Sequence, residues 1–213
     1  INNNIFDINF ARDNCLEPFS KLKKTLISQN VHLNTYDLFQ DLSSIDLLIV
    51  SRFENNLKII LKIIRSNPTV KIIFLVTEEQ NIQPIYFKDA LSNPLFDCVL
   101  TWRDDMVDNK YFFKYNYPNP IRVMTKPKLF QKKKYLSIIN SNKKFRSYIN
   151  DDLYKERLSA IHYFAKNSEI DLYGMGWSKS KDSIIKKVYL GAVVSKIDIL
   201  NEYKFTIAFE NSN

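Results

Sequence analysis

Residues 46–76 read DLLIVSRFENNLKIILKIIRSNPTVKIIFLV, and this stretch decides the fold class. Residues 46–50 and 70–76 are short, nearly continuous apolar runs, which are typical of strands buried on both faces of a sheet. Residues 55–65 between them repeat apolar side chains at helical spacing. A strand, a helix and a second buried strand predict a βαβ unit with parallel strands.

The same alternation extends along the chain on both sides of this unit. Further strands are predicted at residues 5–10, 97–101, 135–140, 170–173 and 204–209, and further helices at residues 16–28, 151–166 and 195–203. The stretch 116–134, with three prolines and a run of lysines, interrupts the pattern, and its residues 119–134 are interpreted as the linker. We therefore expect a doubly wound α/β protein of two domains, residues 1–118 and 135–213, with a ligand cleft beyond the carboxyl ends of the strands.

Charge and glycine are both unevenly distributed. Of the 213 residues, the first 119 carry 13 basic and 14 acidic side chains and the rest carry 18 and 9, so the formal net charge of +8 comes from the second half. Such a field attracts a nucleotide phosphate, a polyanion or an anionic membrane, although solvated lysines would give the same count. The three glycines are Gly174, Gly176 and Gly191, which excludes a glycine-rich phosphate loop from the first 173 residues.

Cysteine and histidine are too few for several kinds of site. The two cysteines, Cys15 and Cys98, and the two histidines, His32 and His162, give neither a disulfide framework nor a zinc-ligand pattern. The chain also lacks an Asp-x-Asp pair, so we expect chemistry without a metal or other cofactor. No apolar run approaches the length of a membrane span.

Polar groups at predicted strand ends are the candidates for chemistry. Glu78 and Glu79 follow the strand at 70–76, where a carboxylate can act as a general base; the alternative is a pair of solvated loop glutamates. In the second half, Asn142 and Lys143 follow a strand and Arg157 lies on the next helix, a combination that suits a diphosphate. The Gly-x-Gly at Gly174 is more often a turn than a phosphate cradle.

Residues 203–212, YKFTIAFENS, make the interpretation more specific. They resemble the Y-K-F-x-x-x-F-E-N-S segment of the α-1,3/4-fucosyltransferases of glycosyltransferase family 10. Four other stretches are similar to segments of that family in the same order: residues 96–105, residues 140–143 followed by 154–158, residues 172–177 and residues 189–196. Residues 1–70 carry no such signature.

This resemblance implies two Rossmann-like domains of the GT-B type, the second incomplete in this chain. It implies inverting, metal-independent transfer of fucose from GDP-fucose to a hydroxyl of an acceptor glycan, such as the N-acetylglucosamine of an N-acetyllactosamine-type or lipopolysaccharide glycan. Glu78 fits the family's base, and Glu79 is a rival because the local pattern departs from the family's E-S-x-x-I-x-P. The implied donor-binding residues are Asn142, Lys143, Arg157, Tyr173, Gly174, Lys196, Glu210, Asn211 and Ser212.

The family also has a Y-x-T-E-K segment soon after F-E-N-S, and this chain ends at Asn213 without it. We therefore expect a C-terminally truncated chain that by itself binds GDP-fucose weakly and is inactive. A bacterial protein of this kind would be cytoplasmic, with peripheral contact to an anionic membrane, and a eukaryotic one would lie in the Golgi lumen; nucleic acid is not an expected partner. The rival interpretations are a GT-B transferase with another nucleotide sugar and a non-enzymatic basic α/β protein that binds nucleic acid or lipid.

Overall fold

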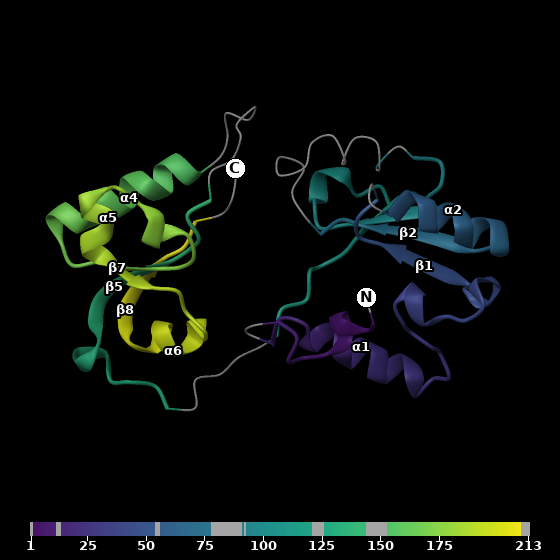
Figure 1. Ribbon diagram of the computed structural model, residues 1–213, viewed down its shortest axis with the longest axis horizontal. Helices are drawn as coiled ribbons and strands as arrows, with labels where there is room; N and C mark the ends of the chain where they lie inside the picture. The colour runs from purple at the N-terminus through teal and green to yellow at the C-terminus, as the bar shows by residue number, and fades with distance from the viewer. Residues whose placement is uncertain are drawn as a thin grey trace. The chain divides into compact units, whose positions relative to one another are not determined.

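The βαβ unit expected from residues 46–76 is present in the computed structural model. It comprises strand β1 (Leu47–Val50), helix α2 (Leu57–Ser66) and strand β2 (Lys71–Leu75), and the two strands pair in parallel. Helix α2 covers these strands (Figure 1) through Ile60 and Ile63, which are fully buried. Burial removes Val50, Ile72 and Phe74 of these strands from water. Leu47 and Ile49 on β1 stay 49% and 45% exposed, so the expected cover on both faces is incomplete at β1 among the described residues.

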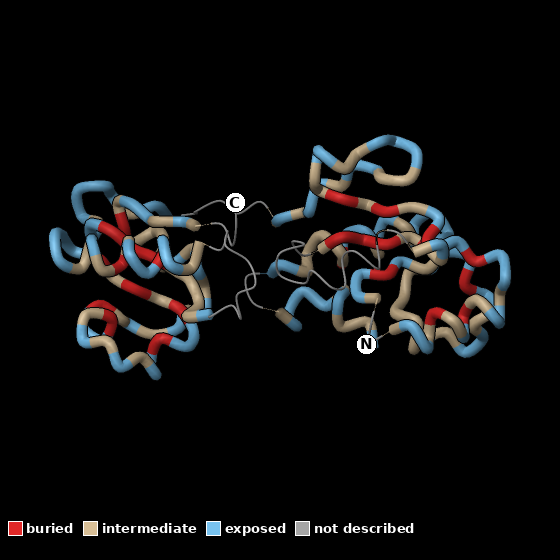
Figure 2. The backbone as a smooth tube through the Cα atoms, turned by 90° about the horizontal axis from the view of Figure 1, so that it is seen from above, coloured by how far each residue is buried: buried red, intermediate tan, exposed pale blue. Residues whose placement is uncertain are grey.

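The structure describes residues 2–11, 14–53, 56–77, 91, 93–120, 126–143 and 153–209. The chain divides into two units, Ile1–Pro120 and Ile121–Asn213, and each has its own buried core. Figure 2 shows buried backbone inside each unit, with exposed segments around it. Within the described residues, no helix is both long enough and apolar enough to cross a bilayer.

The first unit contains a four-stranded parallel sheet in the order β1-β2-β3-β4. Strands β3 (Cys98–Thr101) and β4 (Phe112–Lys114) follow β1 and β2, and helix α1 (Glu17–Ile27) belongs to the same unit. Short 3₁₀ helices occur at Asn4–Phe6, Tyr36–Leu38, Leu42–Ser44 and Asp104–Met106. The core includes Ile72, Phe74 and Val99, and Phe74 stacks on Phe96 with ring centroids 5.0 Å apart.

The strand predicted at residues 5–10 is wrong. Asn2 and Asn3 have positive φ angles, and Asn4–Phe6 forms the 3₁₀ helix η1. The Asn3 side chain accepts a hydrogen bond from the backbone N–H of Thr35 at 2.8 Å, and Asp7 accepts one from the N–H of Asn9 at 2.9 Å. Local side-chain bonds of this kind compete with a strand and favour turns.

The second unit contains another four-stranded parallel sheet, in the order β7-β6-β5-β8. Its strands are β5 (Lys134–Ile139), β6 (Asp171–Tyr173), β7 (Tyr189–Gly191) and β8 (Tyr203–Ile207). Helices α4 (Tyr154–Asn167) and α5 (Ser183–Val188) lie on one face and α6 (Lys196–Asn201) on the other (Figure 1), and 3₁₀ turns occur at Phe130–Lys132 and Trp177–Lys179. The fold class is therefore α/β with two parallel sheets.

Candidate functional site

The strand order of the second sheet reverses at β5. The chain passes from β5 to β6 and β7 on one side, and then returns to place β8 on the other side of β5. In open α/β sheets, connections that leave in opposite directions open a crevice at the carboxyl ends of the two strands at this switch point. Asn140 and Asn142 follow β5, and Phe209 follows β8. These residues mark the candidate site. In the first sheet the described strands run in sequence order, without such a reversal.

Two segments that the sequence singled out lie against each other at this edge. The backbone N–H of Asn140 donates to the carbonyl of Tyr173 at 3.0 Å, and that of Asn142 donates to the carbonyl of Met175 at 2.8 Å. The indole N–H of Trp177, which is buried, donates to the carbonyl of Asn140 at 2.8 Å. The strand-end segment after β5 is thus held by the turn that follows β6.

Glycine is required at one position of that turn. Gly174 has φ +131°, and a Cβ built there would lie 1.7 Å from the carbonyl oxygen of Asn140. Another residue would therefore collide with backbone that cannot rotate away. The turn that the Gly-x-Gly indicated is present, and its first glycine allows the close approach of the two strand ends.

Arg157 brings a buried cation to the same region. It lies near the start of α4, only 5% of the residue is exposed, and its Nη2 donates to the carbonyl of Phe209 at 3.4 Å. The guanidinium lies 4.6 Å from the centroid of the Tyr154 ring. A planar, permanently charged guanidinium is suited to pairing with phosphate oxygens. The structure thus places Arg157 beside the end of β8, although the two are far apart in the sequence.

The two predicted lysines are at the surface. Lys143 is exposed directly after the strand-end segment, and its backbone N–H donates to the carbonyl of Ser141 at 2.9 Å. Lys196 is exposed at the first position of α6, after Ser195, whose hydroxyl caps the helix. Lys143 therefore follows the same strand end as Asn142, whereas Lys196 lies at the start of another element.

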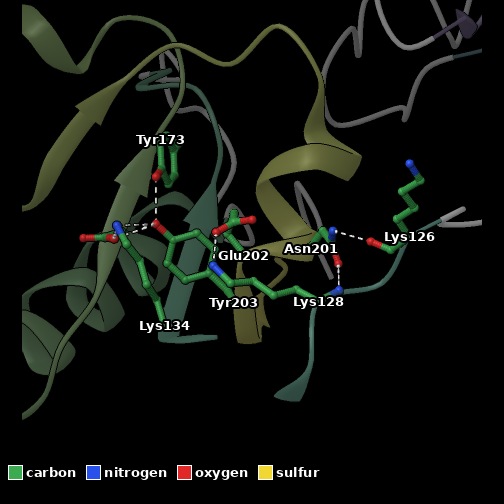
Figure 3. A network of polar contacts seen from close by, with 8 residues as sticks. Lys126, Lys128, Lys134, Tyr173, Asn201, Glu202 and Tyr203 are labelled. Carbon is green, nitrogen blue, oxygen red and sulfur yellow. Dashed lines mark hydrogen bonds and ion pairs between the residues drawn. The ribbon is translucent and has the colours of Figure 1, made fainter. Parts of the chain in front are cut away.

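The Tyr173 hydroxyl belongs to a different cluster, at the beginning of the strands (Figure 3). Its oxygen is 2.7 Å from the hydroxyl of Tyr203, which itself donates to Asp171 at 2.5 Å, and Lys134 contacts Asp171 at 2.9 Å. The single hydroxyl hydrogen of Tyr203 is used in the hydrogen bond to Asp171. The Tyr173 hydroxyl is therefore the donor in its bond with Tyr203. Burial, followed by the bond to Asp171, raises the pKa of Tyr203 above its ordinary value. Only the backbone carbonyl of Tyr173 takes part in the strand-end contacts described above.

Asn140 lies in residues 140–143, one of the stretches similar to the fucosyltransferases, but it was not among the predicted site residues. Its Oδ1 and Nδ2 are shielded from solvent and have no hydrogen-bond partner within the residues that the structure describes. A shielded amide without a partner, at the carboxyl edge of a parallel sheet, is a candidate for ligand contact. Its position at the end of the predicted strand 135–140, two residues before Asn142, was the signal that could have identified it.

Five of the predicted site residues lie outside the described residues: Glu78, Glu79, Glu210, Asn211 and Ser212. In the first unit, the stretch 96–105 forms β3 and its flanks. Asp97 there accepts hydrogen bonds from Lys71 Nζ and from the backbone N–H of Ile72, both at 2.8 Å. The bond to Lys71 is the main reason that the pKa of Asp97 lies below its ordinary value. Asp97 therefore joins the starts of β2 and β3.

No family model, no curated protein and no solved structure matches this chain.

Proposed function

We propose that this chain belongs to an inverting glycosyltransferase that moves fucose from GDP-fucose to a hydroxyl of an acceptor glycan. The donor would bind at the carboxyl edge of the second sheet, and the acceptor would be activated by a carboxylate of the first unit. The proposal rests on the resemblance at residues 203–212 together with the geometry of the strand-end edge.

The observation that carries the proposal is the convergence at the switch point. The segment after β5, the turn after β6 and the buried Arg157 beside Phe209 come from separate parts of the chain, and each belongs to or adjoins a stretch that resembles the fucosyltransferases. In α/β sheets this is the place where nucleotides bind. A diphosphate there would meet the desolvated guanidinium of Arg157 and the shielded side-chain amide of Asn140.

In the proposed reaction the acceptor oxygen attacks the anomeric carbon of fucose from the face opposite the diphosphate. The bond from that carbon to the phosphate oxygen breaks, and GDP departs with its electron pair. Arg157 and Lys143 would stabilise the charge that develops on the diphosphate, which is the task of a metal in other transferases. The hydroxyl proton passes to Glu78, with Glu79 as the rival base.

The test measures GDP release from GDP-fucose with lactose or N-acetyllactosamine as acceptor. The assay uses the full-length natural protein that contains this sequence. Glu78→Ala should lower kcat by roughly 10²-fold to 10⁴-fold while Glu79→Ala stays close to wild type. Arg157→Lys keeps the charge but loses the planar fork, and should lower kcat roughly 10²-fold. Lys187→Ala, an exposed change on α5, is the control for charge alone.

Each rival interpretation has its own outcome. Full activity in both glutamate variants would remove the proposed base. Release of UDP from a UDP-sugar, with none from GDP-fucose, would favour a transferase with another donor. Absence of transfer, with polyanion binding that falls steeply as salt rises, would favour the non-enzymatic basic protein. Activity that EDTA abolishes would overturn metal independence.

A further inference from the structure

The side chain of Asn201, at the end of α6, binds backbone groups of the predicted linker. Its Nδ2 donates to the carbonyl of Lys126 at 3.1 Å, and its Oδ1 accepts the N–H of Lys128 at 2.9 Å, so that the amide spans Pro127 (Figure 3). The linker groups come more than 70 residues earlier in the chain than Asn201. Pro127 has no N–H of its own, and Lys126 and Lys128 lie outside helices and strands, so the amide satisfies backbone groups that regular structure does not.

Glu202, the residue after Asn201, contacts both ends of the segment 128–134. Its carboxylate is 2.6 Å from Lys128 Nζ, and its backbone carbonyl accepts the N–H of Lys134 at 2.9 Å, where β5 begins. The ion pair is partly exposed and adds little by itself. Within the segment, the Phe130 ring lies 6.1 Å from the ring of Phe205 on β8. The chain from Lys126 to Lys134 is thus attached to the corner between α6 and β8 along its length.

We infer that Asn201 is a linker anchor, which holds the chain from Lys126 onward against the corner of α6 and β8 within the second unit. Only an amide supplies a donor and an acceptor at this spacing; aspartate keeps the acceptor and loses the donor. The predicted linker, residues 119–134, is shortened accordingly. The inference stands on the contacts of the second unit and does not depend on the proposed function.

The first test is limited trypsin digestion, read by mass spectrometry at the Lys128–Leu129 bond. Asn201→Ala should speed this cleavage roughly tenfold or more, because cleavage follows the population of released chain. Asn201→Asp is nearly isosteric and should give an intermediate rate. Asn167→Ala is the matched control. It removes a hydrogen bond from a side-chain amide to a backbone carbonyl, that of Tyr163, at the end of α4, and should leave the cleavage rate unchanged.

The second test is amide hydrogen exchange. In the wild type the Lys128 N–H should be protected. In Asn201→Ala it should exchange faster, whereas the Asn142 N–H, bonded to the carbonyl of Met175, should stay as in the wild type. If Asn201→Ala fails to fold, the cleavage rate of Asn201→Asp and the exchange of the Lys128 N–H in the wild type test the anchor instead. An unprotected Lys128 N–H in the wild type would overturn the anchor, and so would equal cleavage in the wild type and whichever Asn201 variant folds.

Discussion

At Gly174, a single methyl group would lie 1.7 Å from the Asn140 carbonyl oxygen, so this residue offers the sharpest test of the strand-end geometry. Gly174→Ala should lower the free energy of unfolding by about 3 kcal/mol or more, because collision is added to backbone strain. Gly191→Ala is the matched control: its φ is also positive, at +121°, but a Cβ there meets nothing within 4 Å. It should cost only about 1 kcal/mol. Urea unfolding followed by circular dichroism gives both values, and equal losses would contradict the close approach.

Residue chemistry also shows what the sequence could and could not predict at the site. Strand-end position correctly indicated a turn at Gly174, because the two glycines are a local signal, whereas the contact of Arg157 with Phe209 joins residues 52 apart in the chain and could not be predicted. The direction of the Tyr173 hydroxyl and the bond from Trp177 to Asn140 could not be predicted. They depend on partners at least 30 residues away in the chain, which only the register of the strands brings together.

At the scale of elements, helices α4 and α5 are joined by one side-chain pair. Asp182 caps α5 by accepting the N–H of Ile184 at 2.8 Å, and its other oxygen lies 2.7 Å from Nε2 of His162 on α4. The hydrogen bond to His162 is the main cause that holds the pKa of Asp182 below its ordinary value, and the backbone N–H groups of α5 add to it. The ionised carboxylate is therefore favoured in the folded state.

This pair predicts how stability changes with pH. A carboxyl whose pKa is depressed in the folded state contributes stability above its unfolded pKa, near 4, and that contribution is lost as pH falls through the lower folded value. Asp182→Asn keeps a capping oxygen and removes the charge. At pH 7 the wild type should be more stable than this variant, and the difference should shrink as the pH falls from 5 to 3. Urea titrations at each pH provide the comparison, and a difference that does not depend on pH would refute the prediction.

Elements with a strong apolar period were predictable, and those stabilised by polar contacts were not. Strand β2 and helix α2 follow the apolar pattern because burial drives them, and β1 follows it although Leu47 and Ile49 stay half exposed. Strand β4 went unpredicted. Its residues Phe112–Lys114 are partly exposed, and the N–H of Phe112 is held by Asp108 at 2.8 Å. The error at residues 5–10 has the same origin, because side-chain oxygens of Asn3 and Asp7 determine the turns there.

At the scale of the whole molecule, the two units have separate cores, and each contains or borders one of the chain's two tryptophans. Trp102 packs against the first core and Trp177 lies in the second. Separate cores with their own sheets should unfold as separate cooperative transitions. Tryptophan fluorescence can follow each transition, in Trp177→Phe for the first unit and in Trp102→Phe for the second.

Cavities made in one core should therefore leave the other unit unchanged. Ile60→Ala empties a site in the first core and Ile161→Ala one in the second, where these residues are 1% and 0% exposed. Each should lower the free energy of unfolding of its own unit by about 3 kcal/mol, from lost transfer energy and the residual cavity. In urea, Ile60→Ala should move the Trp102 transition alone and Ile161→Ala the Trp177 transition alone. If either substitution moved both transitions by the same amount, the two units would share one cooperative structure, and the description of independent cores would be wrong.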